Sequence, residues 1–256
     1  MPLILFHSPR GGTGNSFLAA TTAIALSRAG HDVTALDFDR NGTLQLHFGM
    51  GPGERLPGLD APSDETASAS VQGVALRDAS ALSRQSDFAE GLARNEFGFS
   101  GQKVFVADIA AGDSQLRDML LPHALLEICP LTATAESLMM LPGITDAGIA
   151  KTFFVLSMVE DTRRFARHSM GFLRELLGER LLGQVRRDEA VTEACAMLKS
   201  LGRYAPHSAA LADTIKLGGE ISTLLADLYD EDLDVEFFED PASLGTSDDD
   251  TRHRAA

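Results

Sequence analysis

Cysteine is scarce in this sequence, and tryptophan is absent. The two cysteines, Cys129 and Cys195, stand far apart and without the spacing of metal ligands. A disulfide scaffold or a cysteine-based metal centre would need more cysteines in a closer pattern. We therefore expect two buried thiols in a reducing compartment.

Long apolar runs are also missing. No run approaches the ~18–20 residues that a membrane-spanning helix needs, and the first residues lack the basic and apolar regions of a signal peptide. Basic residues are outnumbered, with 22 Lys and Arg against 37 Asp and Glu, which gives a net charge of −15. That balance disfavours nucleic acid and anionic lipid as partners. We expect a cytoplasmic protein that binds no nucleic acid and does not insert directly into a membrane.

What the sequence does have is a regular alternation of apolar runs and helical patterns. Strands are expected at 3–7, 33–39, 103–108, 125–131, 152–159 and just after 180, and helices at 16–29, near 80–95, at 163–177 and at 213–228. This order predicts an α/β fold with a mostly parallel sheet and helices on both faces. We expect one domain over residues 1–230 with a variable insertion at 51–100, followed by an acidic, disordered tail at 231–256.

A glycine-rich loop, SPRGGTGNS at residues 8–16, lies between the first strand and the first helix. Small residues let successive backbone N–H groups turn around an anion, and the positive end of the following helix faces it. Ser16 can place its hydroxyl on Mg²⁺. The standard phosphate-binding pattern has lysine where this chain has Asn15, so the pattern alone is a poor match.

Three aspartates strengthen the case for a nucleotide site. Asp37 and Asp39 end the second strand, and Asp108 ends the third. The carboxyl ends of parallel strands face one crevice, so these carboxylates and the glycine loop should meet there. Each aspartate alone is more often a turn or cap residue, but their combination at the strand ends favours a Mg-nucleotide site.

These motifs resemble the ParA and MinD type of deviant-Walker ATPases. Arg10 takes the place of the family's signature lysine, Asp37-Phe38-Asp39 matches its D-x-D element, and the segment from Arg187 matches its adenine loop. The resemblance implies a three-layer α/β/α P-loop NTPase fold that binds ATP and Mg²⁺ as a homodimer. It implies Mg²⁺ coordination by Ser16, Asp37 and Asp108 through the nucleotide, and a water-positioning role for Asp39. The nucleotide-binding residues that it implies are Arg10, Gly11, Gly12, Thr13, Gly14, Asn15, Ser16, Phe17, Asp37, Asp108, Arg187 and Asp188.

Within that superfamily the chain resembles the BcsQ (YhjQ) family of cellulose-secretion accessory proteins. The shared features are the arginine at position 10, the missing lysine at 15, and the runs DIAAGDSQL (108–116) and RRDEAVTEACA (186–196). The resemblance implies an assembly or localisation factor that works with other subunits of the cellulose secretion system. It also implies recruitment from the cytoplasm to the inner-membrane synthase complex, which makes biofilm cellulose, with ATP acting mainly as dimer glue.

Asn15 leaves two alternatives open. Loss of a charge-assisted contact with phosphate costs roughly 1.5–3 kcal/mol, so ATP hydrolysis is expected to be weak or absent. The first alternative is an active ParA/MinD-like ATPase that positions another cargo, which the retained Asp39 allows. The second is a scaffold with an empty site. Ser157 stands near the position of an adenine-reading asparagine in many relatives, so the choice of base is also open.

Overall fold

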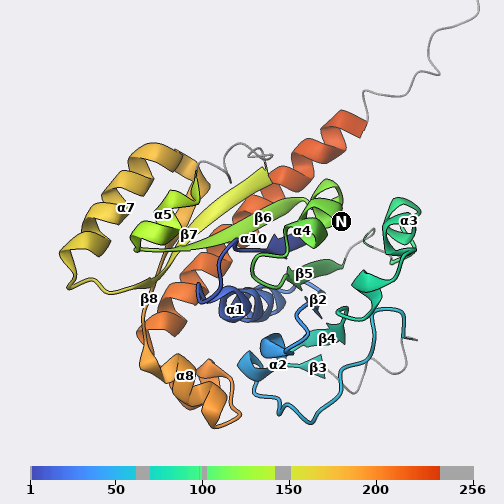
Figure 1. Cartoon of the computed structure of the whole chain (residues 1–256), viewed down its shortest axis with the longest axis horizontal. Helices are drawn as coiled ribbons and strands as arrows, with labels where there is room; N and C mark the ends of the chain where they lie inside the picture. The colour runs from blue at the N-terminus through green and yellow to red at the C-terminus, as the bar shows by residue number, and fades with distance from the viewer. Residues whose placement is uncertain (1, 62–69, 98, 100–102, 142–150, 237–256) are drawn as a thin grey trace, which may run out of the picture.

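The computed structural model describes residues 2–61, 70–97, 99, 103–141 and 151–236, with side chains as far as residue 228 (Figure 1). Within these ranges, eight strands form one sheet in the order β3-β4-β2-β5-β1-β6-β7-β8. Only the short β3–β4 pair is antiparallel. The strands are β1 (Leu3–Phe6), β2 (Val33–Asp37), β3 (Ser70–Val71), β4 (Val74–Asp78), β5 (Val104–Asp108), β6 (Leu126–Thr132), β7 (Thr152–Val159) and β8 (Leu181–Arg186).

The middle of the sheet is apolar on both faces. Every residue of β1, β2 and β5 is buried, which explains why these strands read as continuous rather than alternating apolar runs. The parallel register pairs Asp108 with Phe6 on one side and with Asp37 on the other. The sheet itself therefore brings the ends of β1, β2 and β5 to one line.

One face of the sheet is covered by α1 (Asn15–Arg28) and α10 (Ala209–Glu236), with α2 (Thr43–His47), α8 (Glu189–Ala196) and α9 (Leu201–Tyr204) nearby. Helices α1 and α10 cross so closely that a Cβ at Gly218 would collide with the Cβ of Ala25. Glycine at this point lets the long last helix seat against the helix that follows the glycine-rich loop (Figure 1).

The opposite face carries α3 (Phe88–Ala93), α4 (Ser114–Leu120), α5 (Ala135–Met139) and α7 (Arg164–Leu177). Helices α5 and α7 lie side by side over β6 and β7 (Figure 1). Helices therefore cover both faces, and the predicted fold class is confirmed. None of the helices in the described ranges is long and apolar enough to span a bilayer.

Several local predictions differ from the structure. The helix expected near 80–95 is reduced to a 3₁₀ turn, η2 (Leu82–Arg84), and to α3. Strand β4 was not expected, because VALRD is short and its last two residues are charged. The C-terminal helix begins at Ala209 and ends at Glu236, so its last six residues fall where the acidic tail was expected to begin. The remainder of that tail, 237–256, and residues 62–69 of the expected insertion lie outside the described residues.

A buried polar network joins α4 to β6 beneath the sheet's carboxyl edge. The Arg117 guanidinium donates to both carboxylate oxygens of Glu127, at 2.8 and 2.7 Å, and the Thr152 hydroxyl donates to the same carboxylate at 2.7 Å. These hydrogen bonds lower the pKa of Glu127 to about 2 against the opposing effect of burial. His7, at the end of β1, lies 3.7 Å from the same carboxylate.

Candidate functional site

The glycine-rich loop connects the end of β1 to the start of α1. Gly12 and Gly14 have positive φ angles of 75° and 79°, a conformation that side-chain-bearing residues rarely adopt. Gly14 is the N-cap of α1, and no side chain caps the first N–H groups of this helix. These donors and the positive end of a 14-residue helix are available to an anion.

A cavity of about 640 Å³ opens beside this loop. It is bounded by the loop, the end of β5, the end of β7 and the start of α8. Among its lining residues are Arg10, Gly11, Gly12, Thr13, Gly14, Asn15, Ser16, Phe17, Asp39, Asp108, Arg187 and Asp188. Of the residues expected to bind nucleotide or magnesium, only Asp37 does not line it, and Asp37 lines an adjoining cavity that shares Asp39. The loop and the strand ends therefore converge as the sequence predicts.

The Asn15 side chain turns into the floor of the site. Its amide nitrogen donates to Asp108 Oδ1 at 2.7 Å and to the carbonyl oxygens of Phe6 and Ile109 at 2.9 and 3.1 Å. All three acceptors belong to the ends of β1 and β5. In this position Asn15 ties the strand ends together instead of presenting charge to the cavity.

Asp37 and Asp108 form a buried acidic pair at the ends of β2 and β5. Burial raises the pKa of Asp37 to about 8, and the nearby Asp108 carboxylate adds to this effect. Burial also raises the pKa of Asp108 to about 7, although the Ser16 hydroxyl and the Asn15 amide act in the opposite direction. One carboxylate oxygen of each residue is buried and has no hydrogen-bond partner within the described structure. Two unpaired acceptors of this kind fit a hard cation such as Mg²⁺.

The hydroxyl groups beside this pair complete the polar end of the cavity. Ser16 Oγ and Thr43 Oγ1 lie 2.9 Å apart, and Asp39 Oδ2 accepts from Thr43 Oγ1 at 3.5 Å. Within the described residues, no group of three or more His, Cys, Asp or Glu side chains could hold a metal ion by itself. A magnesium ion here would need further oxygen ligands, as Mg²⁺ does when it is bound through one or two carboxylates and substrate phosphates.

Arg10 is the basic residue of the loop, and its side chain lies over the start of α5. Its Nη1 donates to Thr134 Oγ1 at 3.3 Å and lies 3.6 Å from Glu136 Oε2. Both ion-pair partners are largely exposed, so this contact contributes little to stability. Arg10 is therefore at the cavity rim and can be released from α5 at low cost.

The far wall is built by the segment from β8 into α8. Arg187 contacts Glu160 at 3.6 Å and Glu189 at 3.4 Å. The Asp188 carboxylate caps α8 by accepting from the Ala190 N–H at 3.0 Å, and it accepts from Ser208 Oγ at 2.6 Å. Both residues line the cavity, but the carboxylate of Asp188 is already engaged in holding α8 to the start of α10.

Several cavity residues carry no signal in the sequence that would have identified them. His47 stacks obliquely on Phe17 with ring centroids 5.6 Å apart, and its Nδ1 lies 3.3 Å from Cys195 Sγ. Burial lowers the pKa of His47 to about 4, which keeps the ring neutral at ordinary pH. Met158 has a φ of 54°, uncommon for a side chain of its size, and it lines the cavity beside Ser157. Phe17, His47 and Met158 add apolar surface to the lining of the cavity.

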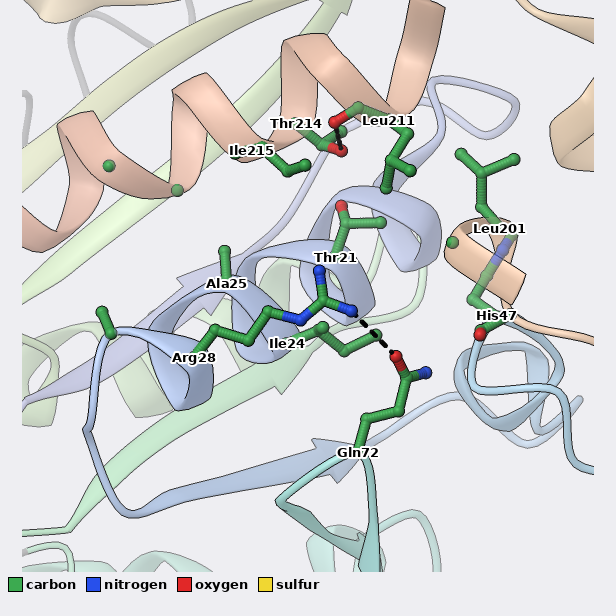
Figure 2. Close-up of a pocket in the computed structure, with 15 residues that line it drawn as sticks. Thr21, Ile24, Ala25, Arg28, His47, Gln72, Leu201, Leu211, Thr214 and Ile215 are labelled. Atoms are coloured by element: carbon green, nitrogen blue, oxygen red, sulfur yellow. Dashed lines mark hydrogen bonds between the residues drawn. The ribbon is translucent and has the colours of Figure 1, made fainter. Parts of the chain in front are cut away.

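A second cavity, of about 270 Å³, lies between α1, α9 and α10 (Figure 2). It shares only His47 with the first cavity. Two of its three hydroxyl groups are used within their own helices, since Thr21 donates to the Phe17 carbonyl and Thr214 to the Leu211 carbonyl, while Ser200 Oγ is buried and has no hydrogen-bond partner within the described structure. Arg28 is hydrogen-bonded to Gln72 across the opening (Figure 2). Among the described residues, the glycine-rich loop and the acidic strand ends therefore lie at the first cavity and the one adjoining it, and not at this second cavity.

Comparison with known families places this geometry in context. The family model described as the CobQ/CobB/MinD/ParA nucleotide binding domain matches residues 4–201, which include β1, the glycine-rich loop and the α8 wall. A comparison with curated protein sequences gave no match.

Solved structures share the fold at low sequence identity. The septum site-determining protein MinD from Pyrococcus horikoshii OT3, complexed with Mg-ADP, superposes with a TM-score of 0.67 at 18% identity, covering 89% of this chain and 98% of that one. A ParA family ATPase from Chlorobium tepidum TLS gives 0.66 at 18% identity, with 85% and 97% covered. A chain of the MinC:MinD cell division protein complex from Aquifex aeolicus gives 0.68 at 13% identity, with 87% and 96% covered.

Proposed function

We propose that this chain, which belongs to the CobQ/CobB/MinD/ParA nucleotide-binding domain family, binds Mg-ATP in the 640 Å³ cavity. We further propose that the bound nucleotide serves chiefly to hold a homodimer together. The observation that carries this proposal is the position of Asn15, whose amide is hydrogen-bonded to Asp108 and the strand ends. The loop and the carboxylates of a nucleotide site are present, while the usual cation for the phosphates is not.

In this proposal the loop N–H groups and the start of α1 bind the phosphates. Ser16, Asp37 and Asp108 hold Mg²⁺ together with phosphate oxygens, and the buried unpaired oxygens of the two aspartates supply the protein's negative charge. Phe17, His47 and Met158 enclose the base, with Arg187 and Asp188 at the outer wall. Bound Mg²⁺ would neutralise charge on the phosphates.

Hydrolysis should be slow for a specific reason. Charge that builds up on the transferred phosphoryl group must be neutralised by preorganised donors. Asn15 offers a neutral amide that is already engaged, so only the backbone, Mg²⁺ and Arg10 remain for this task. Asp39 retains a carboxylate at the cavity, so a residual rate is compatible with the site.

For the biological role we propose an assembly or localisation factor of bacterial cellulose secretion. The support is the resemblance in sequence to BcsQ proteins, carried by Arg10, Asn15 and the runs at 108–116 and 186–196. In this role the nucleotide-bound homodimer acts from the cytoplasm, is recruited to the inner-membrane synthase complex and contacts other subunits of the system. It makes no glycosidic bond itself.

The test is genetic and uses two glycine variants in the host bacterium. Deletion of the gene should strongly reduce secreted, cellulase-sensitive glucan, and the wild-type gene should restore it. Gly12→Val should fail to restore it, because Gly12 has a positive φ in the loop. Gly53→Val is the matched control, since Gly53 is exposed with open space around its Cα and should restore secretion. Undiminished glucan in the deletion strain would contradict the cellulose role.

The second candidate is an active positioning ATPase of the ParA/MinD type, which the carboxylate of Asp39 at the cavity favours. It requires rapid, partner-stimulated turnover that is abolished by Asp39→Ala. A third outcome, an empty scaffold, would show as no change in melting temperature with millimolar Mg-ATP, because a ligand that binds only the native state must stabilise it.

A further inference from the structure

The second cavity, between α1, α9 and α10, has the composition of a small-molecule binding site. Its apolar lining comes from Ile24 and Ala25 on α1, from Leu201 on α9, and from Leu211 and Ile215 on α10 (Figure 2). Ligand sites are typically concave and mostly apolar, with a few polar groups that fix the orientation of the ligand. This cavity, of about 270 Å³, is close to the lower end of their usual range of roughly 300–1,000 Å³, so it suits a small ligand.

Two residues that line this cavity carry a buried polar atom without a hydrogen-bond partner in the described structure. These atoms are Ser200 Oγ and Gln72 Nε2. Ser200 is 2% exposed and directly precedes α9, but its hydroxyl makes no hydrogen bond that caps this helix. Gln72 has a φ of 55°, which is uncommon for a residue with a side chain. A buried polar group without a partner costs free energy, and a ligand oxygen that accepts a hydrogen bond from it would offset this cost.

The charge at this cavity is positive and comes from Arg28. Among the described residues that line the cavity, none is an aspartate, a glutamate or a lysine, and His47 stays neutral because burial lowers its pKa to about 4. The Arg28 guanidinium donates from Nη2 to Gln72 Oε1 at 3.4 Å across the opening (Figure 2). A guanidinium has five N–H donors, so this single long contact leaves others for a ligand. The cavity is therefore positively charged on a chain whose net charge is −15.

We propose that this cavity binds a small organic carboxylate with an apolar body. The carboxylate accepts hydrogen bonds from the Arg28 guanidinium at the opening, and the apolar body lies between α1 and α10. A cationic ligand would meet Arg28 with no carboxylate in the lining to balance the charge, and a sugar phosphate would place its hydroxyl groups against apolar walls. The lining of this site shares only His47 with the cavity proposed for Mg-ATP, so the inference does not depend on nucleotide binding.

Titration of the nucleotide-free, full-length protein with sodium octanoate tests the proposal, because octanoate combines a carboxylate with an apolar chain. Ligand-observed NMR measures the Kd of weak ligands of this kind. Octanamide has the same apolar chain without the charge, so it should bind about tenfold more weakly than octanoate. Arg28→Met removes the charge and keeps an unbranched side chain at this exposed position. It should weaken octanoate binding about tenfold and leave octanamide binding unchanged.

Two glycine variants test where octanoate binds. Gly219 lines the cavity on α10, and a Cβ there would meet open space, so Gly219→Leu should fill the cavity and abolish binding of both probes. Gly171→Leu is the matched control, because Gly171 lies on α7 with equally open space and should leave binding unchanged. Leucine is a better helix former than glycine, so neither change should unfold its helix.

Three results would overturn the proposal. The first is no binding of millimolar octanoate to the wild type. The second is octanamide binding as tight as that of octanoate, which would exclude a carboxylate site. The third is octanoate binding that Gly219→Leu leaves unchanged, or that Gly171→Leu weakens equally, because the probe would then bind outside this cavity.

Discussion

Asn15 determines what this site can do at the level of single residues. Its amide satisfies Asp108 and two strand-end carbonyl oxygens, all in the floor of the cavity. A lysine there would bring a positive charge that can reach either the carboxylates or a phosphate. The loop therefore has the geometry of a phosphate-binding loop but lacks the lysine charge that the standard pattern has at position 15.

Asn15→Lys should strengthen ATP binding. A restored charge-assisted contact is worth roughly 1.5–3 kcal/mol, which corresponds to about a 10- to 150-fold lower Kd. Asn15→Ala is the control, because it removes the amide without adding charge. Isothermal titration with Mg-ATP measures both variants, and an unchanged Kd in Asn15→Lys would show that position 15 does not face the phosphates.

The buried aspartates predict how stability depends on pH. The pKa values of Asp37 and Asp108 are raised from 3.8 to about 8 and about 7. The folded protein therefore keeps protons that the unfolded chain has lost, and its stability should fall as pH rises from about 4 to about 8. Asp108→Asn cannot titrate and should flatten part of this slope. Melting temperatures of the nucleotide-free protein across this range test the prediction, and parallel curves for the two proteins would contradict it.

At the level of residues, the sequence predicts which side chains meet when their positions follow from the ends of the strands. Asp37 and Asp108 meet because they end adjacent parallel strands, and the strand ends are visible in the sequence. The inward turn of Asn15 depends on carbonyl oxygens of Phe6 and Ile109, and the position of His47 depends on a short helix, α2. Neither contact is reflected in the hydrophobic periodicity of the sequence, so only the structure could show them.

At the level of elements, a buried polar network connects helix α4 to strands β6 and β7. Glu127 receives hydrogen bonds from Arg117 on α4 and from Thr152 on β7, and it is almost fully buried. A buried ion pair need not add net stability, but the loss of one partner leaves an uncompensated charge. The network therefore fixes the helix that follows Asp108 to the centre of the sheet.

Glu127→Ala should destabilise the protein by about 3 kcal/mol, the low end for a broken buried pair, because the buried Arg117 guanidinium would lose two hydrogen bonds and keep its ion pair with the exposed Asp118 carboxylate. The double variant Arg117→Met/Glu127→Leu should recover most of that loss, since it removes both charges and fills the space. Urea unfolding of the three proteins measures the effect. A double variant as unstable as Glu127→Ala would show that the ion pair itself supplies net stability.

The elements that the sequence predicts well are the long or strongly apolar ones. Strands β1, β5 and β7 and helix α7 begin and end within a residue or so of the expected positions. Strand β4 and helices α2 and α8 are short, and their stability comes from neighbours that are distant in sequence. Helix α10 extends to Glu236 through an acidic stretch whose composition had favoured a tail. Local composition alone therefore does not show where this helix ends.

For the whole molecule, the proposed homodimer depends on how Arg10 is held. Arg10 lies at the rim of the cavity, and within the described residues its side chain is held to the start of α5 by exposed contacts with Thr134 and Glu136. A guanidinium can bind two phosphate oxygens at once, which suits it to bridging one subunit and the nucleotide of another. In a symmetric dimer, one substitution would remove both bridges.

Glu136→Gln should favour the dimer, because it weakens the ion pair that keeps Arg10 on its own chain. The ATP concentration needed for half-maximal dimer formation should fall by a modest factor, about two- to fivefold, because an exposed ion pair is weak. Sedimentation velocity at increasing Mg-ATP measures this. A higher ATP requirement in Glu136→Gln would mean that the contact with α5 prepares Arg10 for the dimer instead of restraining it.

The central claim, that nucleotide holds two copies of this chain together, is tested most directly by light scattering of the purified protein with and without Mg-ATP. The account predicts the mass of a single chain, 27.4 kDa, without nucleotide and twice that mass in saturating Mg-ATP. Arg10→Ala should remain at the single-chain mass in Mg-ATP, while the matched control Arg84→Ala should dimerise like the wild type. A wild-type protein that keeps the mass of one chain in saturating Mg-ATP, or an Arg10→Ala variant that dimerises equally well, would contradict the account.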